Sequence, residues 1–344
     1  MTADLLLVID HRETQLTLDG RALRVATPGV APRHIPLGLL GLVVVHGRAL
    51  VGCDVWRALA ERHIPAVLQP GRGTGASAGM GAALGSTVAL RTAQHRAADR
   101  PDLTHTIARR LVAAKITAQG RVAEHLAVPE SAVGPRQRLL AHQDEALAHL
   151  ATASTNSELM GIEGAAAVAW FQWLGTWLPP AWNFHGRNRR PPRDPVNALL
   201  SLGYTLLGGD MLAVVQQQGL DPARGFLHSL VPGRESLVLD LIEPLRPLVD
   251  LVVLGLLDKV LTPADFTLSH EDGCRLTKDG RARFYQAWAR ARQDWPLLPS
   301  ETAGAGETER SKVSLHQVCR QQIDLLRRDL QPMLPPLMAV DTGG

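Results

Sequence analysis

A glycine-rich segment at residues 71–86 divides this 344-residue chain into two parts with different hydrophobic periodicity. The segment reads GRGTGASAGMGAALGS and carries six glycines, which indicates a flexible hairpin or a junction between domains. Before it, apolar residues alternate or form short runs, and Asp19-Gly20 is a hairpin signal. The strands expected from this pattern are residues 4–10, 15–18, 23–26, 34–37, 42–46 and 65–68, with one helix at 49–62.

After the glycine-rich segment, apolar residues recur at helical spacing. The helices expected are residues 87–98, 103–127, 144–153, 158–177, 196–218, 236–257, 277–293 and 313–330. Pro244 and Pro247 should interrupt one of them, because proline removes a backbone donor and crowds the preceding turn. We therefore predict an α+β fold: a small β-rich N-terminal domain at 1–86 and a larger all-α domain at 87–344.

The composition is that of a globular protein with a mildly basic charge. Apolar residues make up 45% of the chain and the formal net charge is +3, so an anionic partner is allowed but not required. Three separated cysteines without a CxxC pair suit a reducing cytoplasm, where we expect the protein. No basic segment precedes the first apolar run, and residues 159–182 contain a glutamate and a proline pair. We therefore expect neither a signal peptide nor a membrane span.

Nucleotide-binding motifs give no support for an NTPase or a dinucleotide enzyme. The pattern GxxxxGK[ST] does not occur, so a P-loop is excluded. Gly71, Gly73 and Ala76 imitate a GxGxxA fingerprint after an expected strand. No helix begins cleanly there, and no acid follows at the required distance.

Glu163 is the only charged residue between Leu159 and Trp182, and its neighbours are mostly glycine and alanine. A carboxylate on such a helix approaches closely whatever packs against it, and burying it without a cation is costly. Two interpretations are equally supported by the pattern. Glu163 extends to the solvent at an edge of the helix, or it is paired with a positive charge or a metal ion.

His228, in the segment GFLHS, is followed twelve residues later by Asp240 and after three more by Glu243. Positions i and i+3 share a helix face, so two carboxylates interrupt an otherwise apolar helix. A single histidine of this kind is more often structural, and the two acids would suit a solvated stripe paired with Arg246. Taken together, carboxylates and an imidazole without a thiolate favour Mg²⁺ or Mn²⁺ over Zn²⁺.

The loop HGRNRRPPRDP places four arginines within seven residues, namely Arg187, Arg189, Arg190 and Arg193. Trp182 and Phe184 lie just upstream. Basic groups beside exposed aromatic rings suit phosphate contact with base stacking. A merely solvated loop is equally compatible with the pattern.

Four motifs carry a resemblance to a known family: MGIEGAAAVAWF, RPPRDPVNALLSLGYTLL, GLDPARGFLHS and SLVLDLIEPLRPLVD. In this order and spacing, and over nearly the whole chain, the sequence resembles the CRISPR-associated spacer integrase family. The resemblance implies that the helical domain at 87–344 is the catalytic domain and that the N-terminal domain at 1–86 takes part in dimerisation. It also implies metal ligands at Glu163, His228 and Asp240, which are the expected catalytic residues. Glu243 falls on a nearby acidic position, and the proline that follows it leaves its part as a direct ligand open.

The resemblance also implies an activity and a set of partners. A 3′-hydroxyl of prespacer DNA attacks a phosphodiester of the repeat, a transesterification that needs no nucleotide triphosphate. Family members form homodimers that flank the small partner "Cas two". Candidate contacts to DNA phosphates are the Arg187–Arg193 cluster, Arg234, Arg246 and Lys278, and residues expected to support the site are Asn197 and Tyr204.

Two alternatives remain from the sequence. The same site could use water as nucleophile, which would make the protein a DNA nuclease or branched-DNA resolvase. The acids could also be structural, which would leave a non-catalytic DNA-binding scaffold.

Overall fold

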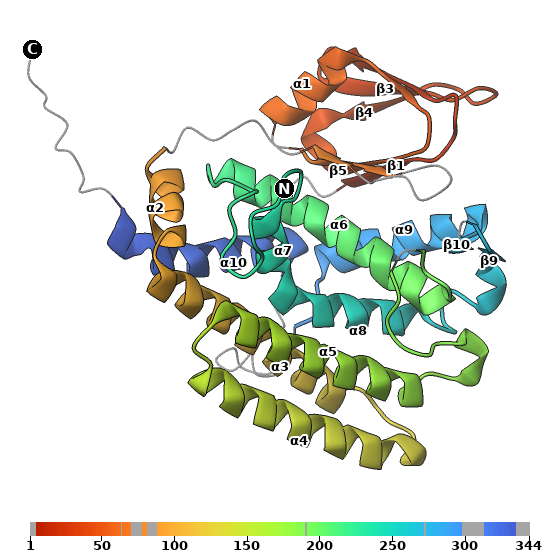
Figure 1. The fold of residues 1–344 in the computed structure, drawn as a ribbon. Helices are drawn as coiled ribbons and strands as arrows, with labels where there is room; N and C mark the ends of the chain where they lie inside the picture. Colours follow the sequence, from red (N-terminus) through yellow and green to blue (C-terminus); the bar gives the residue numbers. More distant parts are fainter. Residues whose placement is uncertain are drawn as a thin grey trace, which may run out of the picture.

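The computed structural model describes residues 5–62, 64–69, 78–80, 88–189, 191–271, 273–297 and 313–334, a strand-rich part followed by a mostly helical part (Figure 1). The N-terminal elements are β1 (Leu5–Ile9), β2 (Gln15–Asp19), β3 (Ala22–Ala26), β4 (Arg33–Pro36), the 3-10 helix η1 (Leu37–Leu39), β5 (Leu40–His46), β6 (Leu50–Val51), α1 (Cys53–Glu61), β7 (Ala66–Gln69) and β8 (Ala78–Met80). Each predicted strand is confirmed, with its ends shifted by two residues at most.

Two four-stranded sheets make up the N-terminal part, in the orders β1-β5-β7-β8 and β4-β3-β2-β6. The predicted hairpin joins β2 to the antiparallel β3, and Gly20 takes the positive φ of 56° that this tight turn requires. The predicted helix at 49–62 is shorter, because Leu50 and Val51 pair with β2 before α1 begins. Of the glycine-rich segment, the structure describes residues 78–80, which form β8 antiparallel to β7.

The central strand β5 connects the two parts of the molecule, because both of its faces are buried. Side chains alternate along a strand. Val43 and Val45 therefore pack into the core of the N-terminal part, whereas Leu42 and Val44 belong to the core shared with the helices. A continuous apolar run is typical of such a doubly covered, parallel strand, and β5 is parallel to both β1 and β7.

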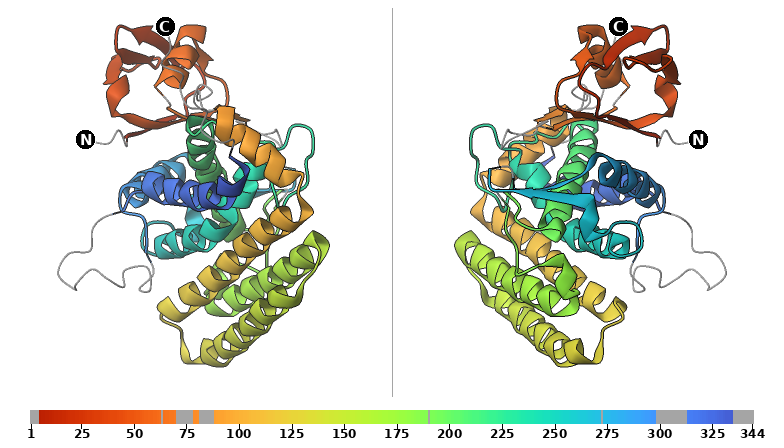
Figure 2. Two further views of the ribbon diagram at one scale, coloured as in Figure 1. Left: turned by 90° about the vertical axis from the view of Figure 1, so that its left-hand side faces the viewer. Right: turned by 90° about the vertical axis from the view of Figure 1, so that its right-hand side faces the viewer.

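The helical part comprises α2 (Val88–Ala98), α3 (Pro101–His125), α4 (Glu130–Thr152), α5 (Asn156–Trp177), the 3-10 helix η2 (Pro180–Trp182), α6 (Pro195–Gln217), α7 (Ser236–Ile242), η3 (Glu243–Leu245), α8 (Arg246–Leu256), η4 (Pro263–Asp265), β9 (Phe266–Ser269), β10 (Gly273–Leu276), α9 (Lys278–Gln293), α10 (Leu315–Leu330) and η6 (Gln331–Met333). All eight predicted helices are found, and α4 begins well before its expected start. Helices α3, α4 and α5 pack together at the end of the molecule away from the strands (Figure 2).

Helix α6 is the central element of the helical part. It begins at Pro195, capped by Asp194, whose side chain accepts a hydrogen bond from the Asn197 N–H. It packs against β7 and β8 on one side and against α7, α8 and α10 on the others (Figure 1). Among the described residues, α6 alone is long and apolar enough to cross a membrane, and 72% of that apolar window is buried inside the protein, as in a core helix.

The predicted interruption of the helix at 236–257 is confirmed. Pro244 lies in η3, and Pro247 lies in the first turn of α8, where its missing N–H costs no helical hydrogen bond. The interruption turns the chain between α7 and α8 while both still pack on α6. Close approach of α8 to α6 depends on Gly203, because a Cβ there would lie 2.7 Å from Val249 Cγ1.

An antiparallel pair, β9 and β10, was not predicted within the helical part. Gly273, the first residue of β10, has a φ of 71° and packs against the loop before α6. The neighbouring Cys274 N–H donates to the Pro192 carbonyl at 2.7 Å. The pair therefore fixes the arginine-rich loop against the rest of the domain.

Candidate functional site

Asp240 lies in α7 and is completely buried. Its Oδ2 accepts hydrogen bonds from the backbone N–H groups of Phe226 and Leu227, at 2.5 and 2.9 Å. Its Oδ1 accepts from the His228 N–H at 2.9 Å and from the His228 ring Nδ1 at 2.7 Å. Four donors thus satisfy the carboxylate, which explains why a charged group is stable without contact to water.

The loop before α7 can wrap around Asp240 only because residue 225 is glycine. A Cβ at Gly225 would lie 2.6 Å from Asp240 Oδ2 and 2.9 Å from the Ser236 carbonyl carbon. The far end of the loop is closed by Arg234, which donates to the Ser229 carbonyl oxygen and, at 3.2 Å, to the Ser229 hydroxyl. The guanidinium of Arg234 is thus engaged within this loop, and its predicted contact with a DNA phosphate stays a prediction.

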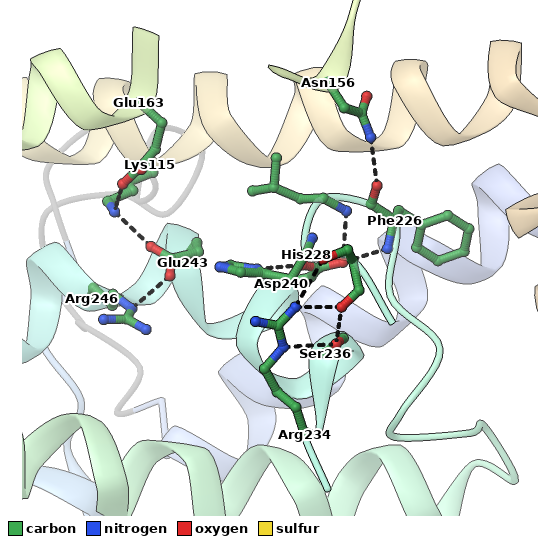
Figure 3. A network of polar contacts seen from close by, with 12 residues as sticks. Lys115, Asn156, Glu163, Phe226, His228, Arg234, Ser236, Asp240, Glu243 and Arg246 are labelled. Carbon is green, nitrogen blue, oxygen red and sulfur yellow. Dashed lines mark hydrogen bonds and ion pairs between the residues drawn. The ribbon is translucent and has the colours of Figure 1, made fainter. Parts of the chain in front are cut away.

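His228 presents its second ring nitrogen away from Asp240. Because a carboxylate only accepts hydrogen bonds, Nδ1 carries a proton, and in the neutral ring this tautomer leaves the Nε2 lone pair free. No residue in the described part of the chain is hydrogen-bonded to Nε2. The ring lies between Asp240 and Glu243 (Figure 3). The His228 side chain is 23% exposed. This arrangement matches that of metal-binding histidines, whose other nitrogen donates to a carboxylate.

Glu163 and Glu243 converge on one lysine. Lys115, from α3, pairs with Glu163 Oε1 and donates to Glu243 Oε2 at 2.6 Å. The other oxygen of Glu243 lies 2.9 Å from Arg246 Nε. The side chain of Glu163 is 25% exposed and that of Glu243 only 7%, so solvent reaches this group of charges mainly at Glu163 on α5.

The charges around Glu243 keep it ionised despite its burial. Burial alone would raise the pKa of its carboxyl, but the neighbouring Arg246 and Lys115 lower that pKa to about 2. At neutral pH the carboxylate of Glu243, on η3, is therefore ionised and gives the site two negatively charged oxygen atoms.

The guanidinium of Arg246 stacks on the aromatic ring of Tyr204, a residue expected to support the site. Its guanidinium carbon is 4.7 Å from the ring centre of Tyr204, and that of Arg187 is 5.5 Å away. The Tyr204 hydroxyl donates to buried Asp250 at 2.5 Å, and Trp170 Nε1 donates to the other oxygen at 2.9 Å. Burial raises the pKa of the Asp250 carboxyl to about 6.

Asn197 holds the arginine-rich loop on α6, as its hydrogen bonds show. Its side-chain amide donates to the Gly186 carbonyl and to Asp194, and its oxygen accepts from Arg187 Nη1 at 2.7 Å. Arg187 also donates to the Ser201 hydroxyl at 3.0 Å. The Arg187 guanidinium is therefore turned inward, and burial lowers its pKa from the ordinary value.

The other predicted DNA contacts lie apart from this cluster. Arg189 and Arg193 are exposed on the loop, Lys278 is exposed at the start of α9, and Arg190 lies outside the described residues. The expectation of exposed aromatic rings beside these arginines is wrong. Trp182 is fully buried and Phe184 is 6% exposed, because both pack into the main core.

Metal binding can be tested against the chemistry of these donors. In the described ranges, no three His, Cys, Asp or Glu side chains surround a common point closely enough to form a metal centre as they stand. The two carboxylates of Glu163 and Glu243 instead contact the Lys115 ammonium. The His228 ring lies on the side of Asp240 that faces Glu243 (Figure 3). Two carboxylates that share a cation, with an imidazole nearby and no thiolate, are the donor types that suit Mg²⁺ or Mn²⁺.

Sequence reasoning missed Lys115 and Asp250. One signal was available for the lysine, since only four of the chain's 36 basic residues are lysine and this one lies in an apolar stretch. Asp250 carried no signal, because an aspartate between leucine and valine in a helix is ordinary when its partners are unknown.

The sequence and the fold were compared with known proteins. The family model for "CRISPR associated protein Cas1" matches residues 7–290. A CRISPR-associated endonuclease Cas1 of Rhodospirillum rubrum is 37% identical over 287 residues, which cover 80% of this chain and 82% of that protein. One from Chlorobaculum tepidum is 32% identical over 299 residues, covering 84% and 86%.

Solved structures share the fold. A Cas1 protein from Thermotoga maritima matches with a TM-score of 0.79 at 22% identity, over 95% of this chain and 97% of that one. A casposase bound to an integration product matches with a TM-score of 0.78 at 18% identity, over 98% and 96%. Family model and relatives agree over most of the chain, which therefore belongs to the family of the CRISPR-associated protein Cas1.

Proposed function

We propose that this protein is the metal-dependent DNA integrase and endonuclease of CRISPR spacer acquisition, which joins prespacer 3′-hydroxyl ends to the repeat by transesterification. One observation supports this most strongly. The carboxylates of Glu163 and Glu243 converge on a single buried cation, and His228 turns a free ring nitrogen toward them. Membership of the Cas1 family, whose relatives here are named endonucleases, agrees with the proposal.

The ligand set that the geometry favours differs in one member from the set inferred from sequence. Glu163, His228 and Glu243 would hold Mg²⁺ or Mn²⁺, and Asp240 would position His228. All the hydrogen bonds of Asp240 are directed at the 226–228 turn and the ring, which leaves no oxygen free to face a shared cation. A divalent ion bound there would polarise the scissile phosphate and help to orient the attacking oxygen.

The chain's own residues supply the remaining requirements of the reaction. Arg246 is fixed between Glu243 and the Tyr204 ring, where it can offset phosphate charge next to the carboxylates. Exposed Arg189 and Arg193 can contact DNA phosphates farther away. The hydrogen bond from His228 to the buried Asp240 would keep the imidazole oriented during the reaction.

The partners proposed are prespacer and repeat DNA, a second copy of this chain, and the small protein "Cas two". A solved Cas1–DNA complex has this fold with a TM-score of 0.53 at 17% identity, over 99% of this chain and 95% of that chain. A Cas6-RT-Cas1–Cas2 complex contains it with a TM-score of 0.79, over 97% of this chain and 36% of that one. These titles describe those proteins, and they make DNA and Cas2 the first partners to test.

The test is strand joining of a prespacer to a repeat-containing plasmid by the purified protein with its Cas2 partner. Glu163→Gln and Glu243→Gln should abolish joining while the fold is preserved by circular dichroism. Glu145→Gln, an exposed glutamate on α4, is the matched control and should join normally. Cleavage without joining would favour the nuclease or resolvase alternative. Full joining by Glu163→Gln would exclude a catalytic role and leave the scaffold.

A further inference from the structure

Lys115 is unusual among the lysines of this protein because it is buried. Its exposed fraction is 7%, whereas Lys259 and Lys278, the other lysines in the described part of the chain, are exposed. It lies on α3 among apolar residues that pack into the helical core. A lysine in such a place is stable only when its charge is compensated.

The compensation comes from two elements that are distant in sequence. Glu163 on α5 and Glu243 on η3 each turn one carboxylate oxygen toward the Lys115 ammonium (Figure 3). The second oxygen of Glu243 is paired with Arg246. The two negative charges of the glutamates are therefore neutralised by the positive charges of Lys115 and Arg246.

A divalent ion would need the same oxygen atoms. Mg²⁺ and Mn²⁺ bind carboxylate oxygens directly, at distances shorter than those of an ammonium hydrogen bond. An ammonium and a divalent ion cannot both lie between Glu163 Oε1 and Glu243 Oε2, because the space is too small and the charges repel. Lysine has a flexible four-carbon stem, and the partial exposure of Glu163 provides a path to the solvent.

We propose that the Lys115 ammonium is an internal cation that holds Glu163 and Glu243 together in the metal-free protein, and that a divalent ion displaces it. The inference rests on the proposed function, since it takes these two carboxylates as metal ligands. Lys115 is then a positioning residue. It keeps the site assembled before metal binds and lowers the affinity for metal, so that binding has to compete with an ion pair already formed.

The first experiment measures Mn²⁺ binding to the purified protein without DNA, by electron paramagnetic resonance. Lys115→Met removes the charge and keeps much of the apolar stem, so we expect Mn²⁺ affinity to increase at least tenfold. In EDTA the same variant should unfold several degrees below the wild type, and Mn²⁺ should stabilise it more than it stabilises the wild type. Lys259→Met, an exposed control, should change neither quantity.

The second experiment uses the unmodified protein and does not depend on the variant folding. Acetic anhydride labelling is followed by mass spectrometry in EDTA and in saturating Mn²⁺. Lys115 should be protected in EDTA and several-fold more reactive in Mn²⁺, whereas Lys259 should react equally in both. Equal labelling of Lys115 in the two conditions would overturn the inference.

The outcomes separate this inference from the proposed function. If the wild type binds Mn²⁺ and Lys115→Met binds it no more tightly, the competition is wrong and the metal site stands. If neither protein binds Mn²⁺, the proposed metal site is wrong, and so is the proposed displacement of Lys115 by a metal ion. Tighter binding by Lys115→Met, lost again in Lys115→Met/Glu243→Gln, would support both.

Discussion

Nδ1 of His228 lies 2.7 Å from Oδ1 of Asp240, and the same carboxylate accepts three backbone N–H groups from residues 226–228. One buried side chain thereby fixes both the loop and the tautomer of the imidazole that the loop carries. The first prediction follows from the difference between these two effects.

Asp240→Asn should destabilise the fold, because an amide NH₂ would replace one acceptor and face donors that are already buried. We expect the free energy of unfolding to fall by about 2–3 kcal/mol, measured by urea denaturation. His228→Gln leaves the carboxylate its three backbone donors and should cost about 1 kcal/mol or less. Both variants should lose strand joining. Equal stability losses would show that the ring, not the loop, is what Asp240 stabilises.

Gly225 should tolerate no side chain. In Gly225→Ala the new Cβ would lie 2.6 Å from Asp240 Oδ2 and 2.9 Å from backbone, so the loop has to shift. We expect a loss of about 1–3 kcal/mol in unfolding free energy and reduced strand joining. Gly208→Ala is the matched control within α6, where a Cβ meets nothing within 4 Å. It should gain about 0.5–1 kcal/mol through helix propensity.

Tyr204 should act through its ring more than through its hydroxyl. Tyr204→Phe removes the hydrogen bond to Asp250 and should cost about 1–3 kcal/mol in stability, but the platform under Arg246 remains. We expect it to retain most strand joining at a temperature where it is folded. Tyr204→Leu removes the platform and should reduce joining more than tenfold. If the two variants join equally well, the stacking of Arg246 has no part in the reaction.

Features of the fold that depend on neighbouring residues could be predicted from the sequence, whereas those that depend on contacts between distant residues could not. The break between α7 and α8 was predictable, because Pro244 and Pro247 act through local geometry. The pair of β9 and β10 was not, because four-residue strands give little pattern and their position depends on the Pro192 carbonyl, far away in sequence. Burial of Trp182 and Phe184 was missed for the same reason.

The sequence indicated which acidic residues belong to the candidate site, but not which partner each of them contacts. Glu163 was detectable because no other charge lies near it in the sequence, and the i,i+3 spacing of Asp240 and Glu243 identified their helix. Spacing gives no information on which of those two acids is saturated by hydrogen bonds. Lys115 could be assigned only when α3, α5 and η3 were seen to meet.

His46 should make the protein acid-sensitive at the contact between its two parts. Its ring Nε2 is hydrogen-bonded to the Tyr285 hydroxyl of α9, and burial, with a contribution from Arg281, lowers its pKa to about 4. The folded state therefore binds fewer protons than the unfolded state between about pH 4 and 6.5, and its stability falls as the pH is lowered through that window. The loss amounts to about 3 kcal/mol at most.

His46→Gln can still bond to Tyr285 and has no proton to gain. Thermal unfolding at pH 7 and pH 4.5 should therefore show a smaller difference for His46→Gln than for the wild type. His34→Gln, an exposed histidine on β4, is the control and should behave like the wild type. An unchanged pH dependence in His46→Gln would assign the acid sensitivity to other groups.

Among the arginines of the loop before α6, we expect Arg187 to stabilise the fold and Arg189 and Arg193 to contact DNA. Arg187 donates inward to Asn197 and Ser201, so Arg187→Ala should lower the unfolding free energy by about 1–3 kcal/mol. Arg189 and Arg193 are exposed, so Arg189→Ser and Arg193→Ser should leave stability unchanged. In DNA binding, each of the latter should reduce the slope of log K against log salt by about 1. A stable Arg187→Ala protein with a reduced salt slope would reverse the assignment and make all three phosphate contacts.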